Sequence, residues 1–149
     1  CFAEHKPLSF EILDIDYFKQ YNDRYGHQAG DDCVRAIAAL IRQMESDQIF
    51  CARYGGDEFV IIYSGMSAEE VCARAEKLRQ DVMALQIEQR YTEGAFGVTI
   101  SQGICHDIPS NGNKNWDFLH VADQALYRAK RGGKNCLCMT DIHGREIEV

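Results

Sequence analysis

The sequence contains no apolar run long enough to cross a bilayer, no signal peptide, no internal repeat and no low-complexity segment. It also lacks a basic excess, since 23 acidic residues against 16 basic ones give a net charge of -7. No broad cationic face is therefore available, and we expect neither nucleic acid nor a membrane surface as a partner. A polyanion such as a nucleoside triphosphate would need help from metal ions, backbone amides or a few placed lysines.

The seven cysteines are odd in number, and no two of them form a C-x-x-C pair. Several stand beside apolar residues such as Val34, Phe50 and Val71, where a cysteine behaves as a small hydrophobe. This usage favours a reduced, cytoplasmic location, which is compatible with a membrane anchor elsewhere in a parent protein. The chain begins at Cys1 rather than at a methionine, so we expect residues 1–149 to be one globular domain cut from a longer protein.

Apolar periodicity predicts helices packed around a mainly antiparallel central sheet, an α+β sandwich. Leu8, Phe10 and Ile12 alternate with Ser9 and Glu11 in the first strand. The order of the strands within the sheet does not follow from the pattern. The elements expected are strands at 8–16, 49–54, 59–63, 96–100 and 136–139, and helices at 18–25, 34–41, 67–85 (opened by a capping box at 67–70) and 118–129.

Two groups of acidic residues stand at the ends of predicted strands. Asp14 and Asp16 close the first strand, and Asp57 and Glu58 follow Gly55-Gly56 at a predicted hairpin tip, where paired glycines tolerate positive φ. If the two strands are neighbours, these carboxylates converge. Two such charges about 4 Å apart repel by roughly 4 kcal/mol at an effective dielectric near 20, so a cation is expected between them.

Oxygen ligands favour magnesium or manganese over zinc. A divalent ion held by few carboxylates keeps positions open for triphosphate oxygens and for a hydroxyl that attacks phosphorus in line. Gly55 and Gly56 have no side chains to obstruct a phosphate that approaches the backbone amides. The alternative is an ordinary solvated hairpin tip without a metal.

The stretch from Arg53 to Phe59 reads R-Y-G-G-D-E-F and resembles the signature of the GGDEF domain, the diguanylate cyclase family. The resemblance covers roughly residues 8–139 and implies the family's palm-like sandwich, which nucleotide cyclases share. Further segments that carry it are Asp14-Ile15-Asp16-Tyr17-Phe18-Lys19, Asn22-Asp23, Gly26-His27, Gly30-Asp31, Thr99-Ile100-Ser101-Gln102-Gly103, Ala122-Asp123-Gln124-Ala125-Leu126-Tyr127 and Gly133-Lys134-Asn135.

The resemblance implies roles for particular residues. Two metal ions per active site, Mg²⁺ or Mn²⁺, would be bound by Asp14, Asp57 and the Ile15 carbonyl, with Glu58 in a supporting or proton-transfer role. The residues implied in substrate binding are Asn22 and Asp31 for the guanine edge, His27 and Phe18 near the base, Gly55 and Gly56 at the phosphates, and Lys130 and Lys134 for the triphosphate.

Four of these assignments have structural alternatives. Lys130 and Lys134 stand near the end of a predicted helix, where a lysine also stabilises the helix dipole. His27 follows a helix-ending glycine and is equally suited to capping. Phe18 continues an apolar stripe with Tyr21 and Tyr25 that indicates a place in the core.

The implied reaction joins two GTP molecules into cyclic di-GMP. The 3′-hydroxyl of one GTP attacks the α-phosphate of the other and pyrophosphate leaves. Since each domain binds one GTP, the resemblance implies a catalytic homodimer, with a sensory domain upstream in the parent protein. Two alternatives remain: a silent GGDEF module that binds GTP or a protein partner, and a cyclase acting within one triphosphate.

The chain departs from the family pattern at two places. The family's Asp-x-Leu-Thr segment and an arginine-containing turn before the first strand are absent, so we expect a domain that lacks this N-terminal part. The family's Arg-x-x-Asp product-inhibition motif is replaced by Ser46-Asp47-Gln48-Ile49, which predicts weak or no feedback through that site.

Overall fold

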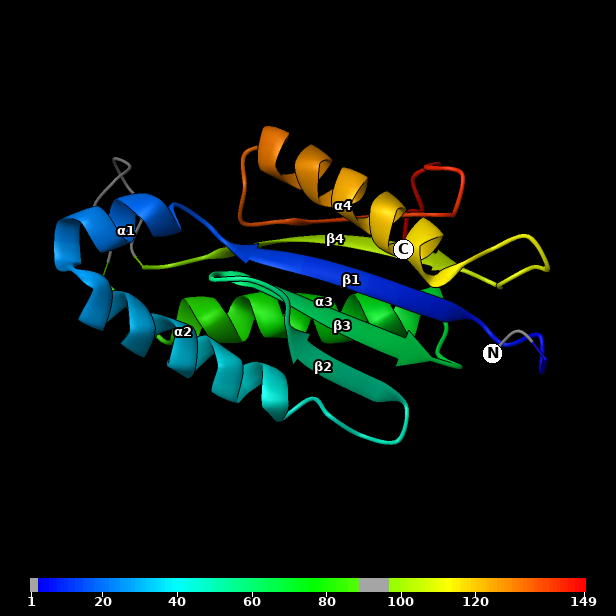
Figure 1. The fold of residues 1–149 in the computed structure, drawn as a ribbon, viewed down its shortest axis with the longest axis horizontal. Helices are drawn as coiled ribbons and strands as arrows, with labels where there is room; N and C mark the ends of the chain where they lie inside the picture. The colour runs from blue at the N-terminus through cyan, green and yellow to red at the C-terminus, as the bar shows by residue number, and fades with distance from the viewer. Residues whose placement is uncertain (1–2, 89–96) are drawn as a thin grey trace.

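The computed structural model describes residues 3–88 and 97–149. Helices and strands in these ranges follow the predicted order closely (Figure 1). They are β1 (Leu8–Ile15), α1 (Phe18–Tyr25), α2 (His27–Arg42), β2 (Ile49–Arg53), β3 (Glu58–Ser64), α3 (Ala68–Ala84), β4 (Ile100–Asp107), α4 (Asn115–Arg131) and β5 (Leu137–Thr140).

The strands form one sheet in the order β2-β3-β1-β4-β5. Three of its strand pairs are antiparallel, and only β5 runs parallel to its neighbour β4. The predicted α+β architecture with a mainly antiparallel sheet is therefore confirmed. The first strand of the sequence lies at the centre of the sheet.

The strand expected at 96–100 is displaced along the chain. Phe96 lies outside the described residues, and β4 runs from Ile100 to Asp107. Its first half contains Ser101, Gln102 and Gly103, which interrupt the apolar alternation although both polar side chains are fully buried. Their burial depends on partners from other elements, so the local pattern placed this strand too early.

Helices cover both faces of the sheet. Leu13 and Ile15 of β1 pack in a core cluster with α2 and α3, whereas Phe10 and Ile12 face α4. Figure 1 shows α4 in front of β1 and β4, with α3 behind the sheet. Because β1 is covered on both sides, all of its residues from Ser9 to Ile15 are buried.

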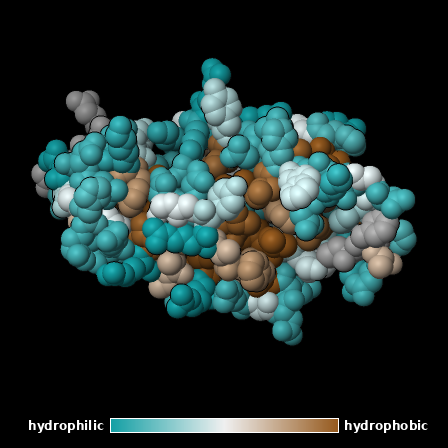
Figure 2. All heavy atoms as spheres, in the orientation of Figure 1, coloured by the Kyte–Doolittle hydropathy of each residue, from teal (hydrophilic) through white to brown (hydrophobic). Residues whose placement is uncertain are grey.

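The outer part of the sheet is less covered on the α4 side. Phe50 of β2 is 61% exposed and pairs with Ile62 of β3, which is half-buried. Figure 2 shows apolar atoms at the surface beside the polar residues of α4. No helix within residues 3–88 and 97–149 combines the length and apolarity needed to cross a bilayer.

The capping box predicted at the start of α3 is confirmed. The Glu70 amide donates to Ser67 Oγ at 3.2 Å, and the Ser67 amide donates to Glu70 Oε2 at 2.8 Å. Two amides without partners inside the helix are thereby satisfied.

Gly103 lets α4 pack directly on β4. A Cβ atom built on Gly103 lies 2.0 Å from the Leu126 amide nitrogen and 2.3 Å from the Ala122 carbonyl oxygen. These are backbone atoms that cannot rotate away. Gly103→Ala is expected to lower the free energy of unfolding by about 2 kcal/mol, because α4 must move off the sheet. Urea denaturation measures this loss.

Gly112→Ala is the matched control, since a Cβ atom there meets nothing within 4 Å. Equal urea midpoints for Gly103→Ala and Gly112→Ala would show that the fold tolerates the movement of α4 off the sheet.

Candidate functional site

The end of β1 and the turn between β2 and β3 lie side by side. Asp14 pairs with Glu58 in the sheet, and the Ile15 amide donates to the Asp57 carbonyl at 3.2 Å. Figure 1 shows both segments at the same end of the sheet, next to the end of α4. The hypothesis that these two strands are neighbours is confirmed.

Asp14 is buried, and its charge is not fully compensated. Burial, and then the adjacent Asp57 carboxyl, raise the pKa of Asp14 to about 6. The Lys130 ammonium forms an ion pair with Asp14 Oδ2 and acts in the opposite direction. Asp14 Oδ1 is buried without a hydrogen-bond partner. The carboxylate pair therefore has capacity for a further cation.

The donor set fits a hard divalent ion only if the ion takes other oxygens as well. Among residues 3–88 and 97–149, no three His, Cys, Asp or Glu side chains gather closely enough to hold a metal by themselves. Asp14 and Asp57 supply two carboxylates, and the Ile15 backbone lies beside them. Such a site suits magnesium, which usually binds one or two carboxylates together with water and substrate phosphates.

Asp16 does not join this cluster, which corrects the expectation from sequence. Its carboxylate accepts hydrogen bonds from Ser101 Oγ at 2.6 Å and from Thr99 Oγ1 at 2.7 Å. The Lys130 ammonium pairs with Asp14 on the α4 side, whereas Asp16 lies beyond the end of β1 and is held by the hydroxyls of Thr99 and Ser101.

The turn that carries Asp57 is closed by backbone hydrogen bonds from Tyr54 and Gly55 to the Glu58 carbonyl, at 2.8 and 3.2 Å. The predicted hairpin is present. The suggestion that its glycines serve to adopt positive φ is wrong, because neither Gly55 nor Gly56 has a positive φ. A Cβ atom on Gly56 meets nothing within 4 Å. The turn is open to an approaching ligand, which is the other property expected of these glycines.

Arg53 holds the turn, although sequence reasoning gave it no role. Its Nε donates to the Gly55 carbonyl at 3.0 Å and its Nη2 to the Gly56 carbonyl at 2.6 Å. Both carbonyl acceptors belong to residues two and three positions after Arg53. This short spacing could have indicated the contact from the sequence. Arg53, the last residue of β2, therefore holds the backbone of the turn in place through these two carbonyls.

The residues implied in guanine binding meet where α1 joins α2. Asn22 Oδ1 is buried without a hydrogen-bond partner, and this side chain lies against Gly30, the residue before the exposed Asp31. A buried amide oxygen without a partner costs about 1–3 kcal/mol, so this position is suited to a ligand that donates a hydrogen bond.

Gly30 is required by the side chain of Asn22. A Cβ atom at Gly30 would lie 1.7 Å from Asn22 Oδ1, so Asn22 must rotate away in Gly30→Ala. We expect the affinity for GMP to fall about tenfold, as one polar contact to the base is lost, while stability changes little. Isothermal titration with GMP measures the loss. Gly112→Ala serves again as control, and unchanged GMP binding in Gly30→Ala would exclude Asn22 from the base site.

His27 and Phe18 begin the two helices of this region. His27 is the first residue of α2 and is exposed, after Gly26 with φ 90°. Phe18 is half-buried against the core, and its ring stacks on that of Tyr21 at 6.4 Å between centroids. Both stand close in sequence to Asn22 and Asp31, but Phe18 is chiefly a core residue here.

The two lysines implied in triphosphate binding lie at the same end of the molecule. Lys130 comes from the last turn of α4 and contacts Asp14. Lys134 follows the helix, has a left-handed backbone with φ 65°, and places its ammonium 3.8 Å from the centre of the Tyr17 ring. Positive charge thus flanks the acidic pair on the α4 side.

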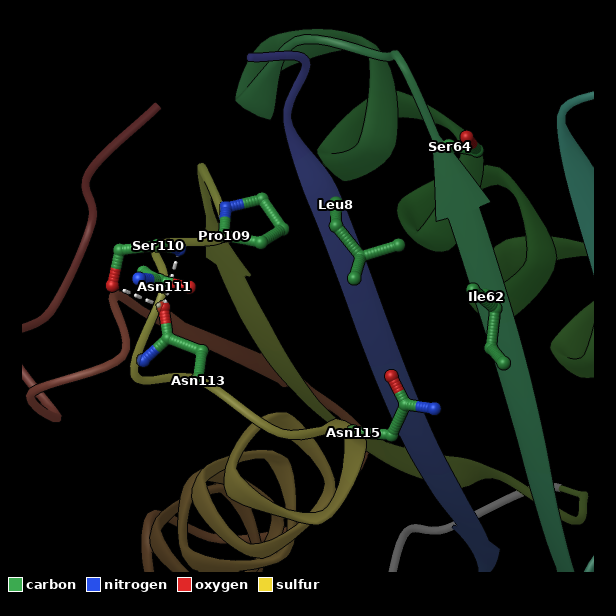
Figure 3. A pocket seen from close by; sticks show the side chains of 8 residues that line it. All are labelled: Leu8, Ile62, Ser64, Pro109, Ser110, Asn111, Asn113 and Asn115. Atoms are coloured by element: carbon green, nitrogen blue, oxygen red, sulfur yellow. Dashed lines mark hydrogen bonds between the residues drawn. The ribbon is translucent and has the colours of Figure 1, made fainter. Parts of the chain in front are cut away.

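A cavity of about 610 Å³ lies at the opposite end of β1 and is a poor candidate for this chemistry. Figure 3 shows it between the start of β1, at Leu8, and the start of α4, at Asn115. Its polar lining consists of hydroxyl and amide side chains without a carboxylate. The chemistry therefore concentrates at the Asp14 end of the sheet.

Residues 1–136 match the family described as "Diguanylate cyclase, GGDEF domain". Among curated proteins, the chain is 36% identical over 131 residues to "Diguanylate cyclase A" of Treponema denticola, covering 87% of this chain and 34% of that protein. It is 35% identical over 140 residues to "Diguanylate cyclase" of Vibrio cholerae, covering 90% of this chain and 40% of that protein. The chain thus spans well under half the length of these relatives.

A solved structure extends the likeness to the fold. The GGDEF domain of DgcB from Caulobacter crescentus, determined in complex with c-di-GMP, superposes with a TM-score of 0.82 at 33% identity. The match covers 95% of this chain and 81% of the other. The strand and helix arrangement is therefore shared over almost the whole chain.

Proposed function

Since the chain belongs to the GGDEF domain family of diguanylate cyclases, we propose that it joins two GTP molecules into cyclic di-GMP with release of pyrophosphate. The observation that carries the proposal is the pairing of the Asp14 end of β1 with a complete Gly-Gly-Asp-Glu turn. A regulatory domain without turnover would not need both carboxylates in contact at an unfavourable charge.

The chain's own residues would bind and orient one GTP. Asn22 and Asp31 would accept the donors on the Watson-Crick edge of guanine, which adenine does not present in the same arrangement. Lys130 and Lys134 would neutralise triphosphate oxygens, and the open face of Gly55 and Gly56 would admit them. Supporting this, Lys130 already pairs with an acidic group at the same place.

Asp14, Asp57 and the Ile15 carbonyl would hold two Mg²⁺ or Mn²⁺ ions, which when bound activate the 3′-hydroxyl and stabilise charge on the phosphate. Glu58 would assist proton transfer from that hydroxyl, because it stands opposite Asp14 in the sheet. Two copies of the domain would have to face each other, each presenting one GTP, so we propose a catalytic homodimer.

Product analysis tests the proposal. The chain is fused to a leucine zipper that supplies dimers and incubated with GTP and Mg²⁺, while pyrophosphate is followed and the product is weighed by mass spectrometry. Cyclic di-GMP is the expected product. Cyclic GMP would instead indicate chemistry within one triphosphate, and GTP binding without pyrophosphate would indicate a silent module.

The segment Ser46–Ile49 predicts how the product acts on the enzyme. It has no guanidinium or paired acid to receive a cyclic dinucleotide, and its ends bond to each other through the Ser46 and Ile49 backbones. Cyclic di-GMP is therefore expected not to bind there. Amide chemical-shift changes at residues 46–49 during a titration with cyclic di-GMP would contradict this.

A further inference from the structure

Asp16 is the centre of a buried polar network beside the proposed active site. Besides the hydroxyls of Thr99 and Ser101, its carboxylate accepts the Asn135 backbone amide at 3.0 Å. Asp16 is only 5% exposed. One acidic side chain therefore ties the end of β1 both to the start of β4 and to the segment that follows α4.

The segment after α4 is held in an unfavourable backbone conformation. Lys134 has φ 65° and Asn135 has φ 47°, so two successive residues other than glycine are left-handed. Tyr17, directly after Asp16, has φ 57° as well. A left-handed backbone is unfavourable for a residue with a side chain, so the surrounding contacts must compensate for the strain.

A second contact fixes Asn135 from the opposite side. Arg79 of α3 donates through Nη1 to Asn135 Oδ1 at 3.0 Å and to the Asn135 carbonyl at 3.3 Å. The guanidinium is itself oriented by an ion pair with Glu76. The amide, carbonyl and side chain of Asn135 are therefore all engaged, by Asp16 on one side and Arg79 on the other.

Part of this strain falls on Lys134, one of the two lysines of the proposed triphosphate site. Lys134 precedes Asn135, and its Nζ is placed over the ring of Tyr17, whose position follows from Asp16. Because the backbone of Lys134 is fixed and its side chain rests on Tyr17, less conformational freedom is lost when the lysine binds an anion. In this arrangement both Asp16 and Arg79 are bonded to Asn135.

We propose that Asp16 and Arg79 are positioning residues, which hold Asn135 in its left-handed conformation and so direct Lys134 at the triphosphate of GTP. The inference rests on the proposed function, and it assigns Asp16 to phosphate recognition through the Asn135 backbone rather than to the metal.

The test compares two nucleotides that share the base and differ in phosphate number. The probes are GMP and α,β-methylene GTP, in which a CH₂ group replaces the bridging oxygen so that pyrophosphate cannot leave. Arg79→Ala is expected to lower the affinity for α,β-methylene GTP about tenfold, because one charge-assisted contact is lost. The affinity for GMP is expected to fall less than about twofold. Arg79→Lys, which keeps a positively charged donor group but loses the planar guanidinium, is expected to recover part of the loss.

Lys77→Ala is the matched control, because it removes an exposed ion pair to Asp81 on the same helix without touching Asn135. It is expected to bind both nucleotides like the unchanged chain. Asp16→Asn, measured in the same way, is expected to reproduce the selective loss. Equal weakening of both nucleotides by Arg79→Ala, or no weakening of either, would overturn the inference. If the unchanged chain binds neither nucleotide, the proposed function fails first and the inference falls with it.

Discussion

Asp57→Asn is expected to reduce cyclic di-GMP formation by at least about 1,000-fold without lowering thermal stability. The amide keeps the size of the side chain but removes one of the two carboxylates at the proposed metal site. It also removes a negative charge from beside Asp14, where burial and the Asp57 contact raise the pKa of Asp14. Loss of activity with equal or higher melting temperature in metal-free buffer therefore separates chemistry from folding.

The measurements are the rate of pyrophosphate release from GTP with Mg²⁺ and the melting temperature with EDTA. Asp47→Asn provides the same chemical change in an exposed segment and is expected to alter neither quantity. A rate in Asp57→Asn within tenfold of the unchanged chain would remove Asp57 from the reaction.

Glu11→Gln is expected to stabilise the fold by roughly 3 kcal/mol at pH 8 and to change it little at pH 4. Glu11 is fully buried in the middle of the sheet and accepts hydrogen bonds from Tyr63 at 2.9 Å and Gln102 at 3.1 Å. Burial raises the pKa of Glu11 to about 7 from an ordinary 4.5, although both hydrogen bonds act against the shift.

The direction of the effect follows from proton binding. Between about pH 4.5 and 7 the folded chain retains a proton on Glu11 that the unfolded chain has lost, so stability falls as the pH rises through this window. Glutamine has no charge to desolvate, and its amide can donate to Gln102 Oε1, which is buried without a partner. The pH dependence caused by Glu11 should therefore disappear in the variant.

Two groups that interact with Glu11 do not titrate in this window. Tyr63 has a pKa raised well above 10, first by burial and then by the Glu11 charge, and Cys51 has a pKa raised to about 12 for the same leading reason. Urea denaturation from pH 4 to 8 provides the measurement, with the exposed Glu148→Gln as control. An unchanged slope of stability against pH in Glu11→Gln would show that folding does not raise the pKa of Glu11.

Local patterns predicted most of the fold but misjudged polar residues at its centre. Ser9 and Glu11 alternate with apolar residues in β1 as solvent-facing residues do, yet both are fully buried because α3 covers that face. Buried polar residues also caused β4 to be placed too early, because its Gln102 donates to the Ala75 carbonyl of α3 inside the core. Alternation with a period of two shows which residues share a face of the sheet. It does not show whether a helix covers that face.

The candidate site divides along similar lines. The sequence showed that Asp14 ends one strand and that Asp57 and Glu58 lie at a hairpin tip, but their proximity depended on a strand order that the pattern did not supply. The bond between Arg79 and Asn135 joins residues 56 positions apart, and nothing in the sequence near either residue indicates it. Asp16 was misplaced because its direction depends on the hydroxyls of Thr99 and Ser101, around the start of a strand that the pattern placed too early.

The position of β1 at the middle of the sheet has a consequence for the growing polypeptide. This strand is synthesised first, but its neighbours β3 and β4 follow only after intervening helices. Their pairing must close long loops, so folding depends on distant contacts and is slow compared with that of a helical bundle. Asp14 lies between Glu58 and Ser101, and a ribosome-bound chain that ends before β4 cannot yet surround it. The acids thus gain their environment only when synthesis of the domain is nearly complete.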